Sequence, residues 1–124
     1  MKSRDAVIRQ KRFQVEEKRR QAGQIEAMVE EFGRMVAELE REIAAEHRRT
    51  GIEDEKHFAY STFARAAKQR RANLQVSIND LQAQLETARA ALDLAEAELR
   101  QEEEKLEREL AAEAAKGHSA RATG

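Results

Sequence analysis

Apolar residues recur along the first third of the chain at alternating spacings of three and four residues. With Ile8 assigned to heptad position a, this pattern continues through Ile43 over five heptads. An average period of 3.5 residues held this long is typical of a helix that supercoils with a partner. Lys11 and Lys18 interrupt the pattern, since both occupy d positions. We predict a first helix over about residues 4–48.

A second heptad register begins at Tyr60 and continues to Glu109. From Leu85 to Ala95 its a positions are leucines and its d positions are alanines, which allow two helices to approach closely. This register predicts a second helix over about residues 61–115. The final residues, 117–124, show no period, and we expect them to form a disordered tail.

The heptad period fails over about residues 49–60, which predicts a connector. Basic residues and then Gly51 end the first helix, because glycine adopts the positive φ that a helix terminus often requires. Asp54 or Ser61 can cap the second helix by accepting a hydrogen bond from an exposed backbone N–H. The predicted fold is therefore all-α, an antiparallel coiled-coil hairpin of two long helices over residues 1–116.

The two registers also predict which side chains form the coiled-coil core. These residues are Val15, Ile25, Val29, Phe32, Val36, Leu39, Ile43, Leu74, Ile78, Leu81, Leu85, Leu92 and Leu99.

The distribution of charge favours the antiparallel hairpin over a parallel homodimer. Residues 1–21 carry eight basic and three acidic side chains, and residues 96–113 carry eight acidic and three basic ones. Folding back brings these arms together, and it also places the acidic residues 30–46 opposite the basic residues 65–71. A parallel dimer would instead oppose like charges. In the hairpin the stems of Lys11 and Lys18 would cover leucines while their ammonium groups reach water or glutamates.

The composition gives little support to an enzyme, a metal site or a nucleic-acid-binding protein. The net charge is −1, cysteine is absent, and the three histidines, His47, His57 and His118, share no helical spacing. We found no nucleophile motif and no glycine-rich phosphate loop, and two paired helices offer no water-excluding pocket. The expected protein is non-enzymatic, without cofactor or metal, without nucleic-acid binding and without insertion into a membrane.

Two features exceed what a coiled coil requires. Phe13 falls at heptad position f, away from the seam, and residues 57–64 hold three of the five aromatic residues, including Tyr60 and Phe63. Exposed aromatic residues dominate protein–protein hot spots, so both features are candidates for partner binding. The alternative for the second feature is that its aromatics close the end of the hairpin by packing on Ile43 and Ile52.

Several short segments carry a resemblance to a known family. They include Met1-Lys2-Ser3-Arg4-Asp5-Ala6, Lys11-Arg12-Phe13-Gln14-Val15, Gln24-Ile25-Glu26-Ala27-Met28, Arg41-Glu42-Ile43-Ala44-Ala45-Glu46, His57-Phe58-Ala59-Tyr60 and Gln69-Arg70-Arg71. These segments resemble the flagellar export protein FliJ family. The resemblance covers about residues 1–110, and its specific parts are the Lys-Arg-Phe-Gln run and the Phe-Ala-Tyr connector, because heptads resemble one another easily.

The resemblance implies a coiled-coil component of flagellar type III export and motility. Such a protein is cytoplasmic, peripheral to the inner-membrane export apparatus, and contacts the hexameric export ATPase, the cytoplasmic domain of the export gate and substrate chaperones. It also implies that the open end, with residues around Phe13 and the stretch Leu99–Leu110 that includes Leu106, enters the ATPase ring, while Tyr60 and Phe63 lie toward the gate. Many relatives have proline where this chain has Ser61, a change expected to loosen the start of the second helix.

Two other functions are compatible with the sequence. One is a generic coiled-coil scaffold, in which Phe13 and the connector aromatics are incidental. The other is a holdase-like export chaperone that uses a partly open leucine seam.

Overall fold

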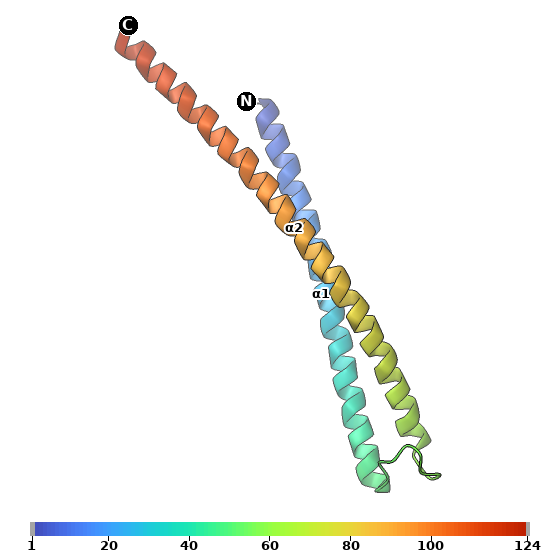
Figure 1. The fold of residues 1–124 in the computed structure, drawn as a ribbon. Helices are drawn as coiled ribbons and strands as arrows, with labels where there is room; N and C mark the ends of the chain where they lie inside the picture. Colours follow the sequence, from blue (N-terminus) through green and yellow to red (C-terminus); the bar gives the residue numbers. More distant parts are fainter. Residues whose placement is uncertain (1, 124) are drawn as a thin grey trace. The chain divides into compact units, whose positions relative to one another are not determined.

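The chain folds into two α-helices and a connector. The structure, a computed structural model, describes residues 2–123 and places them in α1 (Lys2–Thr50), a connector over residues 51–61, and α2 (Thr62–Thr123). Within this described range there is no β-strand. The two long helices pack against each other and run antiparallel (Figure 1), which confirms the predicted all-α hairpin.

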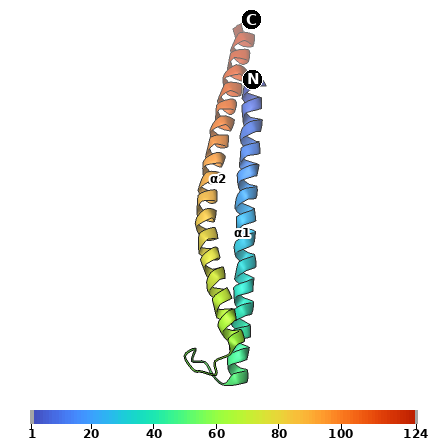
Figure 2. The ribbon, with the colours of Figure 1, turned by 90° about the vertical axis from the view of Figure 1, so that its right-hand side faces the viewer.

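The helices contribute to two compact units. The terminal unit contains residues 1–22 together with 87–124, and the loop unit contains residues 23–86. In each unit one stretch of α1 lies beside one stretch of α2 (Figure 2).

The heptad registers identify the residues that face the partner helix. Every predicted core residue is buried or half-buried. The buried ones are Val15, Leu39, Ile43, Ile78 and Leu85, and the half-buried ones are Ile25, Val29, Phe32, Val36, Leu74, Leu81, Leu92 and Leu99. In the loop unit, Leu39, Ile43 and Ala67 form one buried cluster, with Leu74 packed against it.

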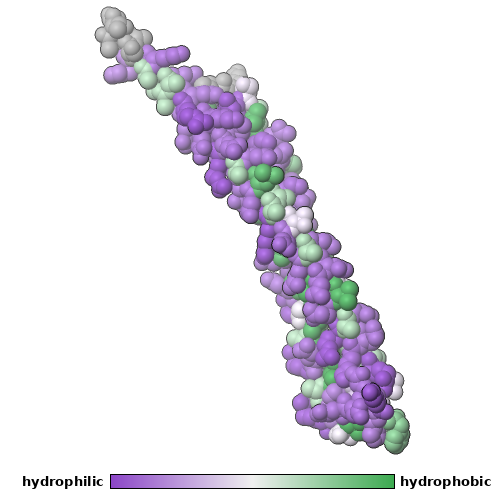
Figure 3. Space-filling model, viewed as in Figure 1, coloured by the Kyte–Doolittle hydropathy of each residue, from purple (hydrophilic) through white to green (hydrophobic). Residues whose placement is uncertain are grey.

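The remaining surface is mostly hydrophilic. On the face drawn in Figure 3, hydrophobic residues show as small separate patches between polar and charged side chains. This distribution follows from the heptad, since a helix that packs against a single partner buries only the stripe of residues facing it.

Gly51 ends α1 in the way its position predicts. Its φ is +72°, and its N–H donates to the carbonyl of His47 at 2.8 Å, which is the αL capping arrangement. Thr50 completes the end of the helix: its hydroxyl donates to the Glu46 carbonyl at 3.0 Å and accepts from the Ile52 N–H at 3.2 Å.

Ser61 caps α2. Its hydroxyl oxygen accepts from the Ala64 N–H at 3.1 Å, and its O–H donates to the Glu46 carboxylate at 2.9 Å. The expectation that serine loosens this helix start is therefore wrong, because the side chain supplies an N-cap that proline lacks. Asp54, the other candidate cap, accepts instead from the Lys56 N–H within the connector.

The structure also differs from the sequence prediction at the C-terminal end. A disordered tail was expected from Gly117, whereas α2 continues through Thr123, and Gly124 lies outside the described residues. The physical reason is that residues 111–123 are rich in alanine and lack proline, so a single glycine, which costs about 1 kcal/mol, does not stop the helix.

The same substitution should have opposite effects at two glycines of the loop unit. Gly33 lies inside α1 with no atom within 4 Å of an added Cβ, so Gly33→Ala should stabilise the fold by about 0.5–1 kcal/mol. At Gly51 the space is equally open but φ is positive, so Gly51→Ala should destabilise by about 1–2 kcal/mol. Urea unfolding followed by circular dichroism measures both changes. Equal shifts in the same direction would contradict the assigned αL cap.

Candidate interaction surfaces

The opposite charges of the two arms meet in the terminal unit. Among the described side chains, basic residues of α1 reach acidic residues of α2 in five ion pairs, as the charge distribution predicted. The pairs are Arg4–Glu102 (2.7 Å), Arg4–Glu109 (2.5 Å), Lys11–Glu98 (3.1 Å), Arg12–Glu103 (3.3 Å) and Arg19–Glu96 (3.6 Å). The Lys11 ammonium thus reaches a glutamate, one of the two outcomes expected for it.

Arg4 forms a polar layer in the seam. By the same registers, Arg4 and its two partners, Glu102 and Glu109, all occupy d positions. The Arg4 guanidinium lowers the pKa of both carboxyls below their usual value of 4.5 by donating hydrogen bonds to them. An ionic contact therefore replaces the apolar contact at this end of the seam.

The loop unit distributes its charges differently from the prediction. Among the described residues, no ion pair joins the acidic stretch 30–46 of α1 to the basic stretch 65–71 of α2. Three of the acids instead pair with arginines three residues further along α1, and Lys68 pairs with Glu55 of the connector at 2.5 Å. The intrahelical pairs are Glu31–Arg34, Glu38–Arg41 and Glu46–Arg49. A partner on the next turn of the same helix lies close without any requirement on the opposite helix.

Tyr60 is part of the hairpin's closed end rather than an exposed anchor. Its side chain is buried, its hydroxyl forms a 2.8 Å hydrogen bond with Nε2 of His47, and Lys68 and Arg65 lie over its ring at 5.2 and 5.3 Å. This corrects its assignment to a partner-binding site. The physical reason is its local contacts: the ring lies under the Lys68 and Arg65 side chains of α2, and its polar hydroxyl reaches the His47 imidazole of α1.

The other two connector aromatics are exposed. Phe58 has 97% of its surface exposed and stacks on His57, and Phe63 is 54% exposed. The three aromatics of segment 57–64 therefore have different environments: Tyr60 closes the hairpin, while Phe58 and Phe63 remain accessible. Phe58 belongs to the aromatic segment 57–64, but the sequence pattern did not single it out as a partner-binding residue.

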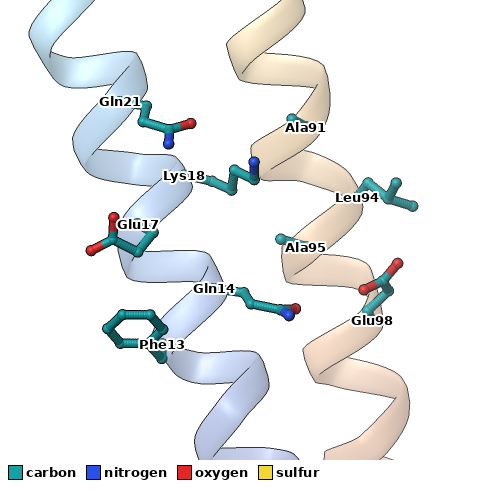
Figure 4. Close-up of a pocket in the computed structure, with 9 residues that line it drawn as sticks. All are labelled: Phe13, Gln14, Glu17, Lys18, Gln21, Ala91, Leu94, Ala95 and Glu98. Carbon is teal, nitrogen blue, oxygen red and sulfur yellow. The ribbon is translucent and has the colours of Figure 1, made fainter.

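A groove runs between the helices of the terminal unit. Phe13, 61% exposed, lines it from α1, and Leu94, 62% exposed, lines it from α2 (Figure 4). Its other apolar lining comes from Ala91 and Ala95, and its volume is about 580 Å³. Leu99 and Leu106, the remaining predicted partner-binding residues, are half-buried in the seam.

Sequence reasoning missed two residues of the terminal unit, although signals for both were present. Leu94 is a large apolar residue at position c, outside the seam, which is the same anomaly that singled out Phe13. Arg4 lies at position d when the first register is extended by one step toward the N-terminus. A charged side chain at this seam position is stabilised by carboxylates across the seam, here those of Glu102 and Glu109.

No site for metal chemistry is found in the part of the chain that the structure describes. Within residues 2–123, no group of three histidine or acidic side chains could hold a metal ion. The ring of His57 is occupied locally, since Nδ1 accepts from the Ala59 N–H at 3.0 Å. The described helices also include no segment long and apolar enough to cross a membrane.

Comparison with known proteins returns no relative: no family model matches the chain, and neither a curated protein nor a solved structure is similar to it.

Acid should weaken the Arg4 layer. Because the pKa values of Glu102 and Glu109 are lowered in the folded chain, the stability they contribute is fully present above the unfolded pKa and is lost as the pH falls through the lowered values. Arg4→Ala should raise both pKa values toward 4.5. NMR titration of the glutamate side-chain carboxyls measures this, with Glu46, whose pKa is lowered by Arg49 and Ser61, as the control that should not move. Unchanged values at Glu102 would refute the layer.

Alanine substitutions of the three connector aromatics should differ in their effect on the free energy of unfolding. Tyr60→Ala removes a buried ring and its hydrogen bond, so we expect a loss of about 3 kcal/mol. Phe58→Ala and Phe63→Ala should each change the free energy of unfolding by less than about 0.5 kcal/mol, because both side chains are exposed. Urea midpoints of the three variants provide the comparison. A Phe58 variant as unstable as the Tyr60 variant would show that the connector packs differently.

Proposed function

We propose that this chain is a non-enzymatic component of the bacterial flagellar protein export apparatus, a coiled-coil stalk or adaptor that links the export ATPase ring to the export gate. It would act in the cytoplasm, at the inner-membrane export apparatus, and promote the export of flagellar proteins. The proposal rests on the resemblance to the FliJ family and on how the residues carrying that resemblance are placed.

The observation that carries the proposal is the exposure of Phe13. This residue lies in the Lys-Arg-Phe-Gln run, the most specific part of the resemblance, and 61% of its surface is accessible outside the seam. A coiled coil gains nothing from an exposed phenylalanine at this position, whereas aromatic side chains are enriched among residues that anchor partners. The terminal unit is therefore our candidate for the ATPase contact.

The loop unit supplies the second candidate contact. Phe58 and Phe63 are exposed there, and basic side chains without an ion pair in the described chain lie near them in sequence, among them Lys56 and Arg70. Since Tyr60 is buried, a contact with the export gate would depend on Phe58 and Phe63. An adaptor needs two separate contact surfaces, and the two units provide one each.

The hydrolysis rate of the export ATPase from the same organism tests the proposal most directly. Addition of the full chain should raise the rate and the fraction of hexamer. Phe13→Ala should lower the affinity about tenfold, because an exposed aromatic anchor is lost while the seam is unaffected. The matched control is Val76→Ala in the loop unit, since Val76 is also exposed, at 62%. This variant should leave the affinity for the ATPase unchanged.

Two results would argue against the ATPase role. No binding and no change in rate would remove it and leave the gate adaptor or a generic scaffold. Stimulation that Phe13→Ala leaves intact would keep the ATPase role but place the contact elsewhere. Circular dichroism of each variant shows whether the helices persist.

A further inference from the structure

The groove of the terminal unit carries an unpaired positive charge. Lys18 occupies a d position of α1 and extends across the groove toward α2 (Figure 4). Its ammonium forms no ion pair or hydrogen bond with any residue of the described chain. The two glutamates of the groove are already engaged, Glu17 with Arg20 at 2.8 Å and Glu98 with Lys11 at 3.1 Å.

Two amides flank this lysine. Gln14 and Gln21 lie four residues before it and three residues after it, so the three side chains form one row along α1, pointing toward α2 (Figure 4). Neither amide makes a side-chain hydrogen bond within residues 2–123. The row therefore presents one cation and two amide donors, a combination that binds a carboxylate.

The other lining is apolar. Ala91 and Ala95 face the polar row from α2 with only methyl groups, which leaves the groove open, and Phe13 and Leu94 lie on the outer sides of the two helices (Figure 4). The lining residues of each helix are spaced three or four apart over two turns. A third helix laid along such a groove presents its side chains at the same spacing.

We infer that this groove binds an amphipathic helix of a partner protein that carries an Asp or Glu within its apolar stripe. The carboxylate would accept from the Lys18 ammonium and the flanking glutamine amides. The apolar residues one turn before and after it would contact Phe13, Ala91, Leu94 and Ala95. Charge selects the occupant, because the only unpaired formal charge in the groove is positive and a basic or purely apolar helix would leave it unpaired. The inference does not depend on the export role.

The test uses synthetic helices as probes for the full-length chain. The probe is a peptide of about 15 residues with leucines at i, i+3 and i+7, a glutamate at i+4 and a terminal tryptophan. The reference peptide carries lysine in place of the glutamate. Because the chain contains no tryptophan, the peptide's indole fluorescence reports binding directly. We expect the glutamate form to bind at least about tenfold more tightly than the lysine form.

Variants of the chain locate the binding. Lys18→Glu should reverse the preference between the two peptides, and Lys18→Gln should reduce it. The double variant Phe13→Ala and Leu94→Ala should lower the affinity for the glutamate peptide about tenfold. Val76→Ala, equally exposed in the loop unit, should leave the affinity unchanged. Circular dichroism confirms that each variant remains helical.

Three results would overturn the inference. The first is no binding of the glutamate peptide to the wild-type chain. The second is equal affinity for the glutamate and lysine forms. The third is a preference that survives Lys18→Glu in a helical variant, because the carboxylate would then be bound elsewhere. Reversal by Lys18→Glu, together with weakening by the apolar double variant, would support it.

Discussion

The structure depends on one apolar seam between α1 and α2. In a two-helix arrangement each side chain has a partner on one side only, so most of the seam is half-buried rather than enclosed. Even the best-buried large residues, Ile8 and Leu39, retain 4% exposure. Hydrophobic burial, at roughly 25 cal/mol per Å² of apolar surface, therefore has to accumulate along the length of the heptads, since no compact centre exists to supply it.

Polar contacts assist the seam where it is weakest. At the terminal end, Arg4, Lys11 and Glu102 occupy seam positions that apolar residues fill elsewhere, and their ion pairs keep these side chains in place. Exposed ion pairs contribute only about 0–1 kcal/mol each, but their common direction disfavours alternatives that oppose like charges. At the closed end, Glu46 links α1 to Ser61, and His47 links it to Tyr60, so hydrogen bonds hold the connector against α1.

The sequence predicted the parts of this structure that follow from periodicity. The seam residues from Val15 to Leu99, the helix stop at Gly51 and the pairing of the two charged arms all follow from spacing and net charge. The intrahelical pair Glu46–Arg49 and the burial of Tyr60 did not, because they depend on which of several nearby partners a side chain reaches. The end of α2 was missed because alanine-rich sequence without a heptad favours helix as well as disorder. Of the candidate surfaces, Phe13 was visible as an apolar residue outside the seam. Lys18 could be identified as an unpaired cation in a groove only once the structure had shown its neighbours.

In a two-helix protein, irregularities of the seam and interaction surfaces are the same features. A lysine at a d position opposite alanines leaves space that in a larger domain a third element would fill. Here that space opens to the solvent as the groove beside Lys18, Ala91 and Ala95. A core with one layer of contacts cannot bury an imperfect layer, and each small or charged seam residue therefore changes the surface directly. For the same reason, the register that makes the helices pair also determines where a partner has access. A small or charged residue in the seam stabilises the helix pair less, and it leaves a surface that a partner can contact.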